Sequence, residues 1–205
     1  MEYNKEKREI RSDKILNNLD KLVIDFIRVL NKYVNYVIIS GYVSIVLGRT
    51  RITEDVDVFI EKISKEKLSE LYENLKKAGF WCLNTENTDE MYDFLINKMA
   101  IRFARKDVFV PNFEVKFPKD DLDKATFNDF ITLFLPEGKM KISSLERHIA
   151  FKRHYLGSDK DIEDSLHIEK LFKRDIDDNK LNKLKDLVKI RKNEEKKNFF
   201  KAGQR

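Results

Sequence analysis

Two apolar runs separated by a Ser-Gly break constrain the fold of this chain more than any other part of its sequence. Residues 36–39 are apolar throughout, Ser40-Gly41 interrupts the run, and residues 42–47 are mostly apolar up to Gly48. Residues 55–60 then begin with alternating polar and apolar side chains. A short apolar run and an alternating segment are both typical of strands, and glycine marks the turns between them. The order strand, turn, short helix, strand predicts an α/β fold.

The second of these strands carries two carboxylates, Asp55 and Asp57. Because alternate side chains of a strand share a face, both are expected on one side while the intervening valines point into the core. Carboxylate oxygens are the ligands that Mg²⁺ prefers. An Asp-x-Asp pair also occurs on the solvated face of an edge strand, but its distance from Ser40-Gly41 favours the metal site.

The rest of the chain divides into an α/β part and a helical part. Apolar spacing predicts helices over residues 14–33 and 65–78 and strands over 80–83, 99–103, 112–117 and 131–135. After residue 143 only helices are predicted, over 144–155, 159–172 and 181–192. We therefore expect an α/β (α+β) domain with an N-terminal helix over residues 1–140, and a helical C-terminal region over 141–205.

Composition limits the environment and the partners. Of the 205 residues, 41% are hydrophobic and 38% charged, and no apolar stretch approaches the roughly 20 residues of a membrane helix. Cys82 is the single cysteine, which excludes an internal disulfide and fits a cytoplasmic protein. The net charge of +5 is matched by residues 174–205 alone, with 11 Lys and Arg against 6 Asp and Glu. This basic tail is compatible with binding to RNA phosphates and equally with a solvated helix, and both interpretations remain open.

A third carboxylate is expected from a neighbouring strand. Glu114 alternates with apolar residues, so it faces away from the core, as the Asp-x-Asp pair does. Two-metal sites place such carboxylates around an in-line displacement, and Glu114 would help to hold the metal that activates the attacking hydroxyl. Lys116 shares its face and would neutralise phosphate. The alternative is a surface ion pair of Glu114 with Lys116 or Arg102.

The Ser40-Gly41 turn is the expected phosphate site. The N–H groups and the dipole at the start of the following helix favour an anion there, and Ser40 adds a hydroxyl donor. A triphosphate would then lie between this turn and one or two Mg²⁺ ions on Asp55 and Asp57. That arrangement is the one needed for in-line nucleotidyl transfer.

Residues 38–58 resemble the signature of the polymerase-beta-like nucleotidyltransferase superfamily, a strand ending in Gly-Gly or Gly-Ser, a short helix, and Asp-x-Asp or Asp-x-Glu on the next strand. Arg51-x-Thr53-x-Asp55-Val56-Asp57 looks like the motif of a small prokaryotic branch that includes toxins of abortive-infection-type toxin–antitoxin systems. The resemblance implies a mixed sheet with flanking helices, Mg²⁺ and an NTP donor.

Residue by residue, the resemblance matches Ser40 and Gly41 to the phosphate-binding turn, Asp55 and Asp57 to the metal-binding pair, and Glu114 to the third acid. Tyr42 departs from the pattern, because most of the superfamily has a second Gly or Ser there, and it would crowd the triphosphate.

A second match lies downstream, where residues 144–152 and 158–164 look like the helix-Lys and Lys-Asp-x-x-Asp elements of the same branch. It implies that Lys152 reaches the triphosphate and that Lys160 and Asp161 line or brace the cleft. The Ser158-x-x-Asp161 spacing is also that of a helix cap, and both readings remain open.

The sequence thus predicts a Mg²⁺-dependent enzyme that moves an NMP from an NTP to an acceptor hydroxyl, on an RNA such as a tRNA or on a protein. The predicted catalytic and metal-binding residues are Asp55, Asp57 and Glu114. The predicted nucleotide-binding residues are Ser40, Gly41, Tyr42, Arg49, Lys116, Lys152, Lys160 and Asp161. The resemblance adds a toxin role with a cognate antitoxin as partner. The alternative is a catalytically impaired protein of the same fold that binds nucleotide or RNA.

Overall fold

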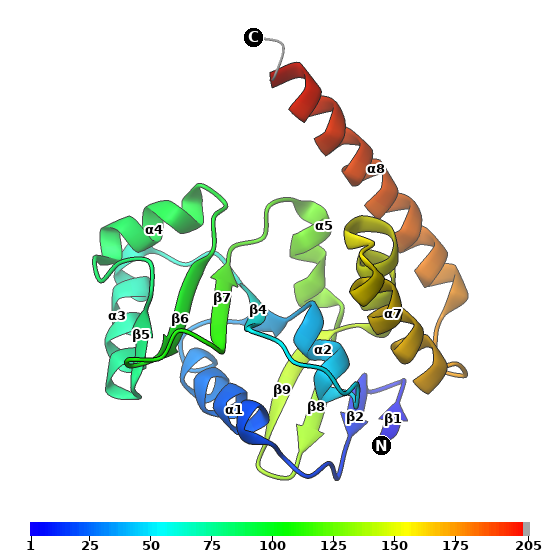
Figure 1. Cartoon of the computed structure of the whole chain (residues 1–205), viewed down its shortest axis with the longest axis horizontal. Helices are drawn as coiled ribbons and strands as arrows, with labels where there is room; N and C mark the ends of the chain where they lie inside the picture. The colour runs from blue at the N-terminus through cyan, green and yellow to red at the C-terminus, as the bar shows by residue number, and fades with distance from the viewer. Residues whose placement is uncertain (203–205) are drawn as a thin grey trace. The chain divides into compact units, whose positions relative to one another are not determined.

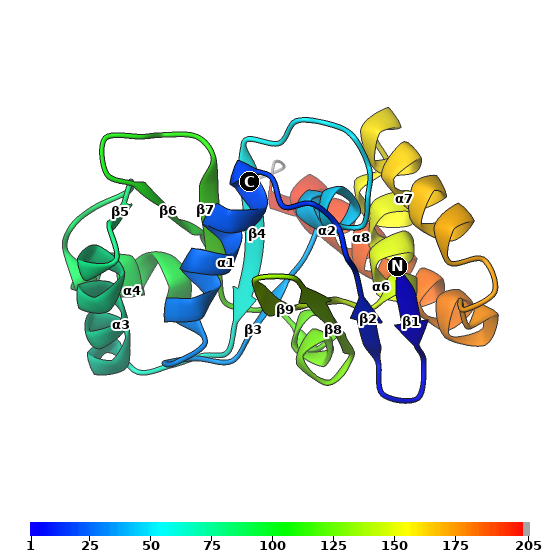
Figure 2. The ribbon, with the colours of Figure 1, turned by 90° about the horizontal axis from the view of Figure 1, so that it is seen from below.

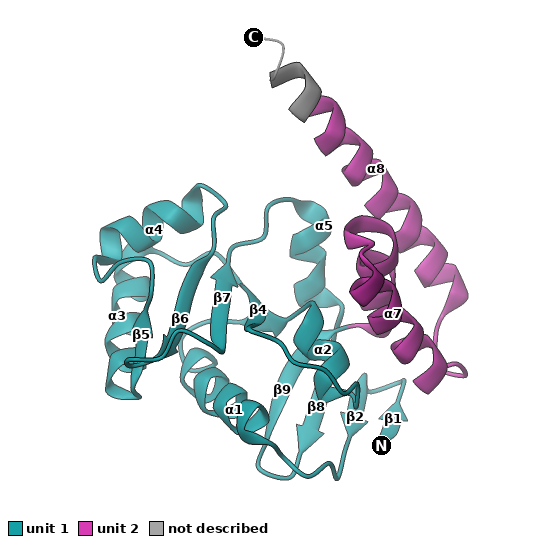
Figure 3. Cartoon of the chain, in the orientation of Figure 1, with its two compact units in different colours: residues 1–143 teal, residues 144–205 magenta. Residues whose placement is uncertain are grey.

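The computed structural model of the chain describes the backbone of residues 1–202 and the side chains through residue 198. It divides into two compact units, residues 1–143 and residues 144–205, coloured separately in Figure 3. The expected boundary between residues 140 and 141 falls inside a strand that ends at Ser143.

Unit 1 is built on a nine-stranded mixed sheet (Figure 1). Across the sheet the strands run β1 (Glu2–Asn4), β2 (Glu9–Arg11), β8 (Phe130–Leu135), β9 (Gly138–Ser143), β3 (Tyr36–Ile38), β4 (Asp55–Ile60), β7 (Asn112–Lys116), β6 (Ile101–Arg105) and β5 (Phe80–Cys82). The pairs β2–β8, β3–β9 and β4–β7 are parallel, and the remaining pairs are antiparallel. The mixed sheet confirms the predicted fold class.

Helix α1 covers one face of this sheet. The helices and short 3₁₀ turn of unit 1 are α1 (Asn18–Leu30), α2 (Gly41–Val46), α3 (Lys65–Lys77), α4 (Thr88–Ile96), α5 (Asp121–Lys124) and η1 (Ala125–Asn128). Phe26 of α1 stacks on Phe113 of β7, with ring centroids 3.9 Å apart and planes inclined by 7°. The same face buries Val56 and Val58. The alternate residues of β4 and β7 therefore point to the opposite face.

The opposite face changes from apolar to charged along β4. Near the end of the strand, Phe59 packs in a buried cluster with Val37 and with Phe127 of η1. At the start of the strand the same face carries Asp55, which is exposed, and Asp57, which is half-buried. Charged side chains at this position are not explained by core packing.

Unit 2 is helical, as predicted. It consists of α6 (Leu145–Ala150), a π-helical segment η2 (Phe151–Leu156), α7 (Asp159–Leu171) and α8 (Asp178–Ala202). Helix α8 is longer than the predicted 181–192, because its last part lacks apolar periodicity but is rich in Lys and Glu, which favour helix. The last three residues of the basic tail lie outside the described part. Among residues 1–202 no helix combines the length and the apolar composition needed to cross a membrane.

Six elements of unit 1 were not predicted, namely β1, β2, β9, α4, α5 and η1. Strands β1 and β2 have three residues each and bury a single apolar side chain between them, Ile10, too little to produce a pattern. Strand β9 buries Met140 and Ile142 between lysines, and it was not assigned. Residues 84–90 are polar and provide no apolar spacing that predicts helix α4, which Asn87 caps by accepting a hydrogen bond from the Asp89 N–H at 2.8 Å.

Candidate active site

Strands β4 and β7 bring the three predicted carboxylates to one face of the sheet. The parallel register pairs Asp57 with Glu114 and Asp55 with Asn112. Paired residues of neighbouring strands share a face, as do alternate residues of one strand. Asp55, Asp57 and Glu114 therefore point to the same side, opposite the face covered by α1.

The Ser40-Gly41 turn lies beside Asp57. The N–H of Ile39, the residue before the turn, donates to the main-chain oxygen of Asp57 at 2.9 Å. Ser40 has φ 61° and ψ −143°, a conformation that glycine adopts readily and residues with a Cβ rarely adopt. Such strained residues concentrate at binding and catalytic sites. The backbone thus singles out Ser40 independently of its place in the motif.

The Arg51 guanidinium lies against Gly41. A Cβ at Gly41 would collide with the Arg51 guanidinium, so no larger residue fits without moving Arg51. The Thr53 hydroxyl donates to the main-chain oxygen of Asp55 at 3.0 Å and is 3.3 Å from its Oδ1. Both defined residues of the Arg-x-Thr motif therefore connect the turn to the carboxylate strand. Arg49, two residues before Arg51 in the same loop, is half-buried, and its main-chain N–H donates to the Ser44 carbonyl at 2.9 Å.

The Tyr42 side chain belongs to the core rather than to the turn. It is fully buried, and its hydroxyl donates to Asp20 Oδ1 at 2.9 Å. Burial, followed by the charge of Asp20, raises the pKa of Tyr42 well above its ordinary value, so the phenol stays protonated. Asp20 also pairs with Lys14 at 3.0 Å. The Tyr42 hydroxyl is therefore directed to Asp20 in the core, and the main chain of Tyr42 lies at the turn.

Two of the three carboxylates are engaged by cations on the same face. Lys116 Nζ lies 2.5 Å from Asp57 Oδ1, and Arg102 Nη2 and Nε lie 2.6 and 2.8 Å from Glu114 Oε1. The Glu114 hydrogen bond, followed by its charge, raises the pKa of Arg102, which stays protonated. The alternative pairing of Glu114 with Arg102 is thus present. The Arg102–Glu114 pair has an exposed guanidinium and contributes about 1 kcal/mol or less, so a more strongly bound cation can replace Arg102. The Lys116–Asp57 pair is mostly buried, and its displacement costs more.

The donor set fits Mg²⁺ by chemistry and by its placement on one face. The side chains are nevertheless directed to their own cations, and among the described residues no three or more His, Cys, Asp or Glu side chains are clustered closely enough to hold a metal. If Mg²⁺ binds here, Asp55, Asp57 and Glu114 are the residues that would hold it.

Two of the three predicted residues of unit 2, Lys152 and Asp161, belong to a buried ion cluster. Lys152, which is 3% exposed, places its Nζ 2.6 Å from Asp161 Oδ1 and 3.1 Å from Asp164 Oδ2. Asp161 also forms a capping box with Ser158 at the start of α7, which confirms the capping reading. Burial raises the pKa of Asp161, but the hydrogen bonds from Lys152 and Ser158 outweigh it, and the pKa lies below its ordinary value. Lys160 is exposed on the first turn.

An open hollow of about 360 Å³ borders the carboxylates. Its lining consists of Glu54, Asp55, Leu83, Asn84, Arg102, Phe109, Asn112 and Glu114. Sequence reasoning missed Asn84, Phe109 and Asn112. Only Phe109 had a signal, since an aromatic residue between two valines in a turn has no core position to fill.

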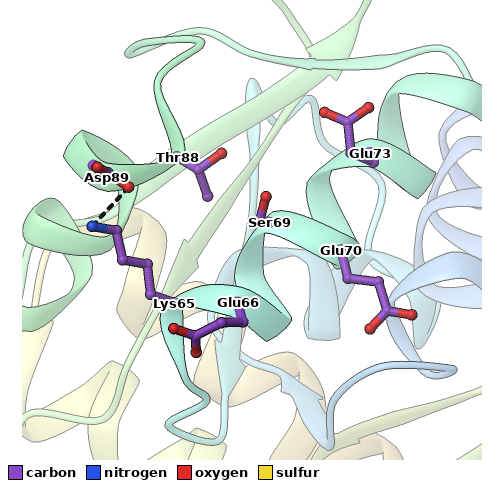
Figure 4. Close-up of a pocket in the computed structure, with 7 residues that line it drawn as sticks. All are labelled: Lys65, Glu66, Ser69, Glu70, Glu73, Thr88 and Asp89. Atoms are coloured by element: carbon purple, nitrogen blue, oxygen red, sulfur yellow. Dashed lines mark ion pairs between the residues drawn. The ribbon is translucent and has the colours of Figure 1, made fainter.

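A second open hollow, of about 570 Å³, lies between α3 and α4 (Figure 4). Glu66, Glu70 and Glu73 of α3 line it, and Lys65 pairs with Asp89 of α4 at 2.7 Å across its edge. It contains none of the predicted site residues.

Comparisons with known proteins find only distant structural similarities. No protein-family model and no curated protein sequence matches this chain. An antigenic nucleotidyltransferase-like protein from Paracoccidioides brasiliensis is 20% identical, with 83% of this chain and 88% of that chain covered and a TM-score of 0.49. The antibiotic-resistance factor ANT(2'')-Ia is 13% identical, with 88% and 96% covered and a TM-score of 0.49. At this level neither similarity carries an argument about chemistry, which rests on the site itself.

Proposed function

We propose that this chain is a Mg²⁺-dependent nucleotidyltransferase that transfers an NMP from an NTP to an acceptor hydroxyl. One observation carries the proposal: three carboxylates share an open sheet face directly beside a strained Ser-Gly turn. The carboxylates are Asp55 and Asp57 on β4 and Glu114 on β7, and the turn is fixed to Asp57 by the Ile39 hydrogen bond. Neither feature is required by packing, and together they supply the two halves of a site for a metal-bound triphosphate.

In the proposed reaction the acceptor oxygen forms a bond to the α-phosphorus while the α–β phosphoanhydride bond breaks and pyrophosphate leaves. The Ser40 hydroxyl and the main-chain N–H groups of the turn would hold the departing phosphates. Glu114 would accept the proton of the attacking hydroxyl. Bound Mg²⁺ would neutralise phosphate charge and lower the pKa of the attacking hydroxyl.

The basic residues near the carboxylates have a second use in this proposal. Lys116 forms an ion pair with Asp57, and Arg102 forms one with Glu114. Released from those carboxylates, both cations would be available to phosphate oxygens on the same face. The predicted role of Lys116 in nucleotide binding is therefore compatible with its ion pair. Arg49 remains a proposed nucleotide-binding residue on the loop after α2.

Nucleotide roles for Lys152, Lys160 and Asp161 receive less support. Lys152 and Asp161 neutralise each other within unit 2, and Asp161 is also committed to the helix cap. Of these three residues only Lys160 is exposed. Lys160→Met tests its role in nucleotide binding: a raised KM for NTP supports that role, and an unchanged KM excludes it.

The decisive comparison is Asp57→Asn against Asp93→Asn, a matched change at an exposed aspartate of α4. Each protein is incubated with labelled NTP, Mg²⁺ and total cellular RNA or protein, and folding is checked by thermal unfolding. Asp57→Asn is expected to abolish incorporation, while the control retains it. Unchanged incorporation in folded Asp57→Asn contradicts the mechanism. Mg²⁺-dependent NTP binding by wild type without transfer supports the alternative, a non-catalytic nucleotide-binding protein.

The toxin role rests on the sequence resemblance alone. It predicts that induced expression arrests growth in a manner that depends on Asp57, and that the product of a neighbouring gene co-purifies with the chain. Growth unaffected by the wild-type protein excludes a toxin role without touching the transferase proposal.

A further inference from the structure

The hollow beside the carboxylates lies on their far side from the Ser40 turn. The strand order β3–β4–β7–β6–β5 places the turn at the end of β3 (Figures 1 and 2). The hollow begins at Asp55 and Glu114, continues over Arg102 of β6, and reaches Asn84, which follows β5. The carboxylates therefore separate the turn from the hollow.

In-line transfer requires this kind of separation. The attacking oxygen and the leaving pyrophosphate lie on opposite sides of the α-phosphorus. With the departing phosphates at the Ser40 turn, as in the proposed function on which this step rests, the acceptor hydroxyl approaches from the hollow. The hollow is then the acceptor site, and its lining indicates the acceptor's chemistry.

Phe109 gives the hollow an aromatic surface that the fold does not need. Its side chain is 75% exposed at the tip of the β6–β7 loop. Asn112 holds this loop in place, because its Nδ2 lies 3.2 Å from the Glu54 carbonyl and 3.4 Å from the Phe109 carbonyl. A large exposed aromatic ring at a fixed position beside polar groups is typical of a binding surface.

Asn112 supplies a second, independent observation. The residue is only 9% exposed, and its Oδ1 is a buried acceptor with no hydrogen-bond partner among the described residues. Nearly all buried acceptors in folded proteins are paired, so an unpaired one beside a hollow marks an amide that a small shift would bring to a donor of a bound ligand. The hollow thus combines an aromatic face, a buried acceptor, and the donors of Arg102 and Asn84.

We propose that the hollow binds the 3′-terminal nucleoside of a single-stranded RNA acceptor. Its base stacks on Phe109, and its ribose hydroxyl is directed to Asp55 and Glu114. Nucleobases offer a flat face together with hydrogen-bond donors and acceptors at their edges, and single-stranded RNA is commonly recognised by this combination. A serine or threonine of a protein acceptor has no flat ring to match Phe109.

Direct binding tests the proposal without any need for catalysis. The probe is a single-stranded RNA hexamer with a fluorophore on its 5′ end, titrated with protein in Mg²⁺ without NTP and followed by anisotropy. Phe109→Ala is expected to weaken binding about tenfold or more, Phe109→Trp to retain it, and Val110→Ala on the same loop to stay within about twofold. Absence of RNA binding by wild type, equal affinity of Phe109→Ala, or an equal loss in Val110→Ala overturns the proposal.

Steady-state transfer separates failure of this inference from failure of the proposed function. Phe109→Ala is expected to raise the KM for RNA and to leave the KM for NTP unchanged, whereas Asp57→Asn is expected to abolish transfer and to retain RNA binding. If transfer is active but insensitive to Phe109→Ala, or if the label goes to protein, the nucleoside site is refuted and the proposed transferase activity stands. If RNA binding depends on Phe109 but no NTP gives transfer, the RNA site stands and the proposed transferase activity is refuted.

Discussion

Replacement of Ser40 by glycine is expected to stabilise the protein and to weaken its activity. Ser40 has φ 61° and ψ −143°, and a residue with a Cβ in such a region costs about 1–3 kcal/mol. Glycine removes that cost, but its larger freedom in the unfolded chain offsets about 0.5–1 kcal/mol. The net gain in the free energy of unfolding therefore lies between about 0 and 2.5 kcal/mol and is about 1 kcal/mol at mid-range.

Ser40→Ala is the matched control, because it removes the same hydroxyl but keeps the Cβ and the strain. Urea unfolding followed by the fluorescence of Trp81, the single tryptophan, reports on unit 1 in both variants. If the hydroxyl holds a phosphate oxygen, both variants lose nucleotide incorporation by the same factor, about tenfold or more. Equal stability of the Gly and Ala variants refutes the strain argument, and full activity in both refutes the phosphate role.

Three further changes test the packing around the site and in unit 2. Tyr42→Phe leaves buried Asp20 without one donor and is expected to cost about 1–3 kcal/mol in urea unfolding, with the KM for NTP unchanged; a raised KM places the phenol at the nucleotide. Asp161→Asn is expected to lower stability by about 1–3 kcal/mol at neutral pH. Because the folded-state pKa of Asp161 is lowered, the wild-type advantage is present above its unfolded pKa, near 4, and is lost as the pH falls through the folded value; a constant difference from pH 7 to pH 2 contradicts this. Phe26→Ala removes a fully buried ring and is expected to cost about 3–5 kcal/mol in thermal or urea unfolding, whereas a cost below about 1 kcal/mol contradicts the stacked core.

Local alternation was enough to predict the carboxylate face. Asp55 and Asp57 share a face on any strand, and Glu114 follows the same rule on its own strand. That the two strands are parallel neighbours, with Asp57 opposite Glu114, depends on the strand order and was not available from spacing. The hollow was missed for the same reason, because Asn84, Phe109 and Asn112 meet only after β5, β6 and β7 pair.

Other differences come from partners that are distant in the chain or from the backbone itself. Tyr42 was expected at the nucleotide, but Asp20, 22 residues earlier, holds its hydroxyl in the core. The strain at Ser40 is a backbone property that a Ser-Gly pair does not reveal. Lys152 looked like a phosphate ligand, yet Asp161 and Asp164 on the next helix neutralise it. Sequence motifs therefore predicted which carboxylates share a face with one another, but not the partners that the folded chain gives to Tyr42 and Lys152.

The central claim is that the chain transfers a nucleotidyl group, and the position of the label in the donor tests it most directly. Wild-type protein and Asp57→Asn are incubated with Mg²⁺, total RNA and each NTP labelled at either the α- or the γ-phosphate. Wild type is expected to transfer label to RNA from the α-position only, and Asp57→Asn is expected to transfer neither label. Transfer of the γ-label, or undiminished α-label transfer by folded Asp57→Asn, contradicts the central claim.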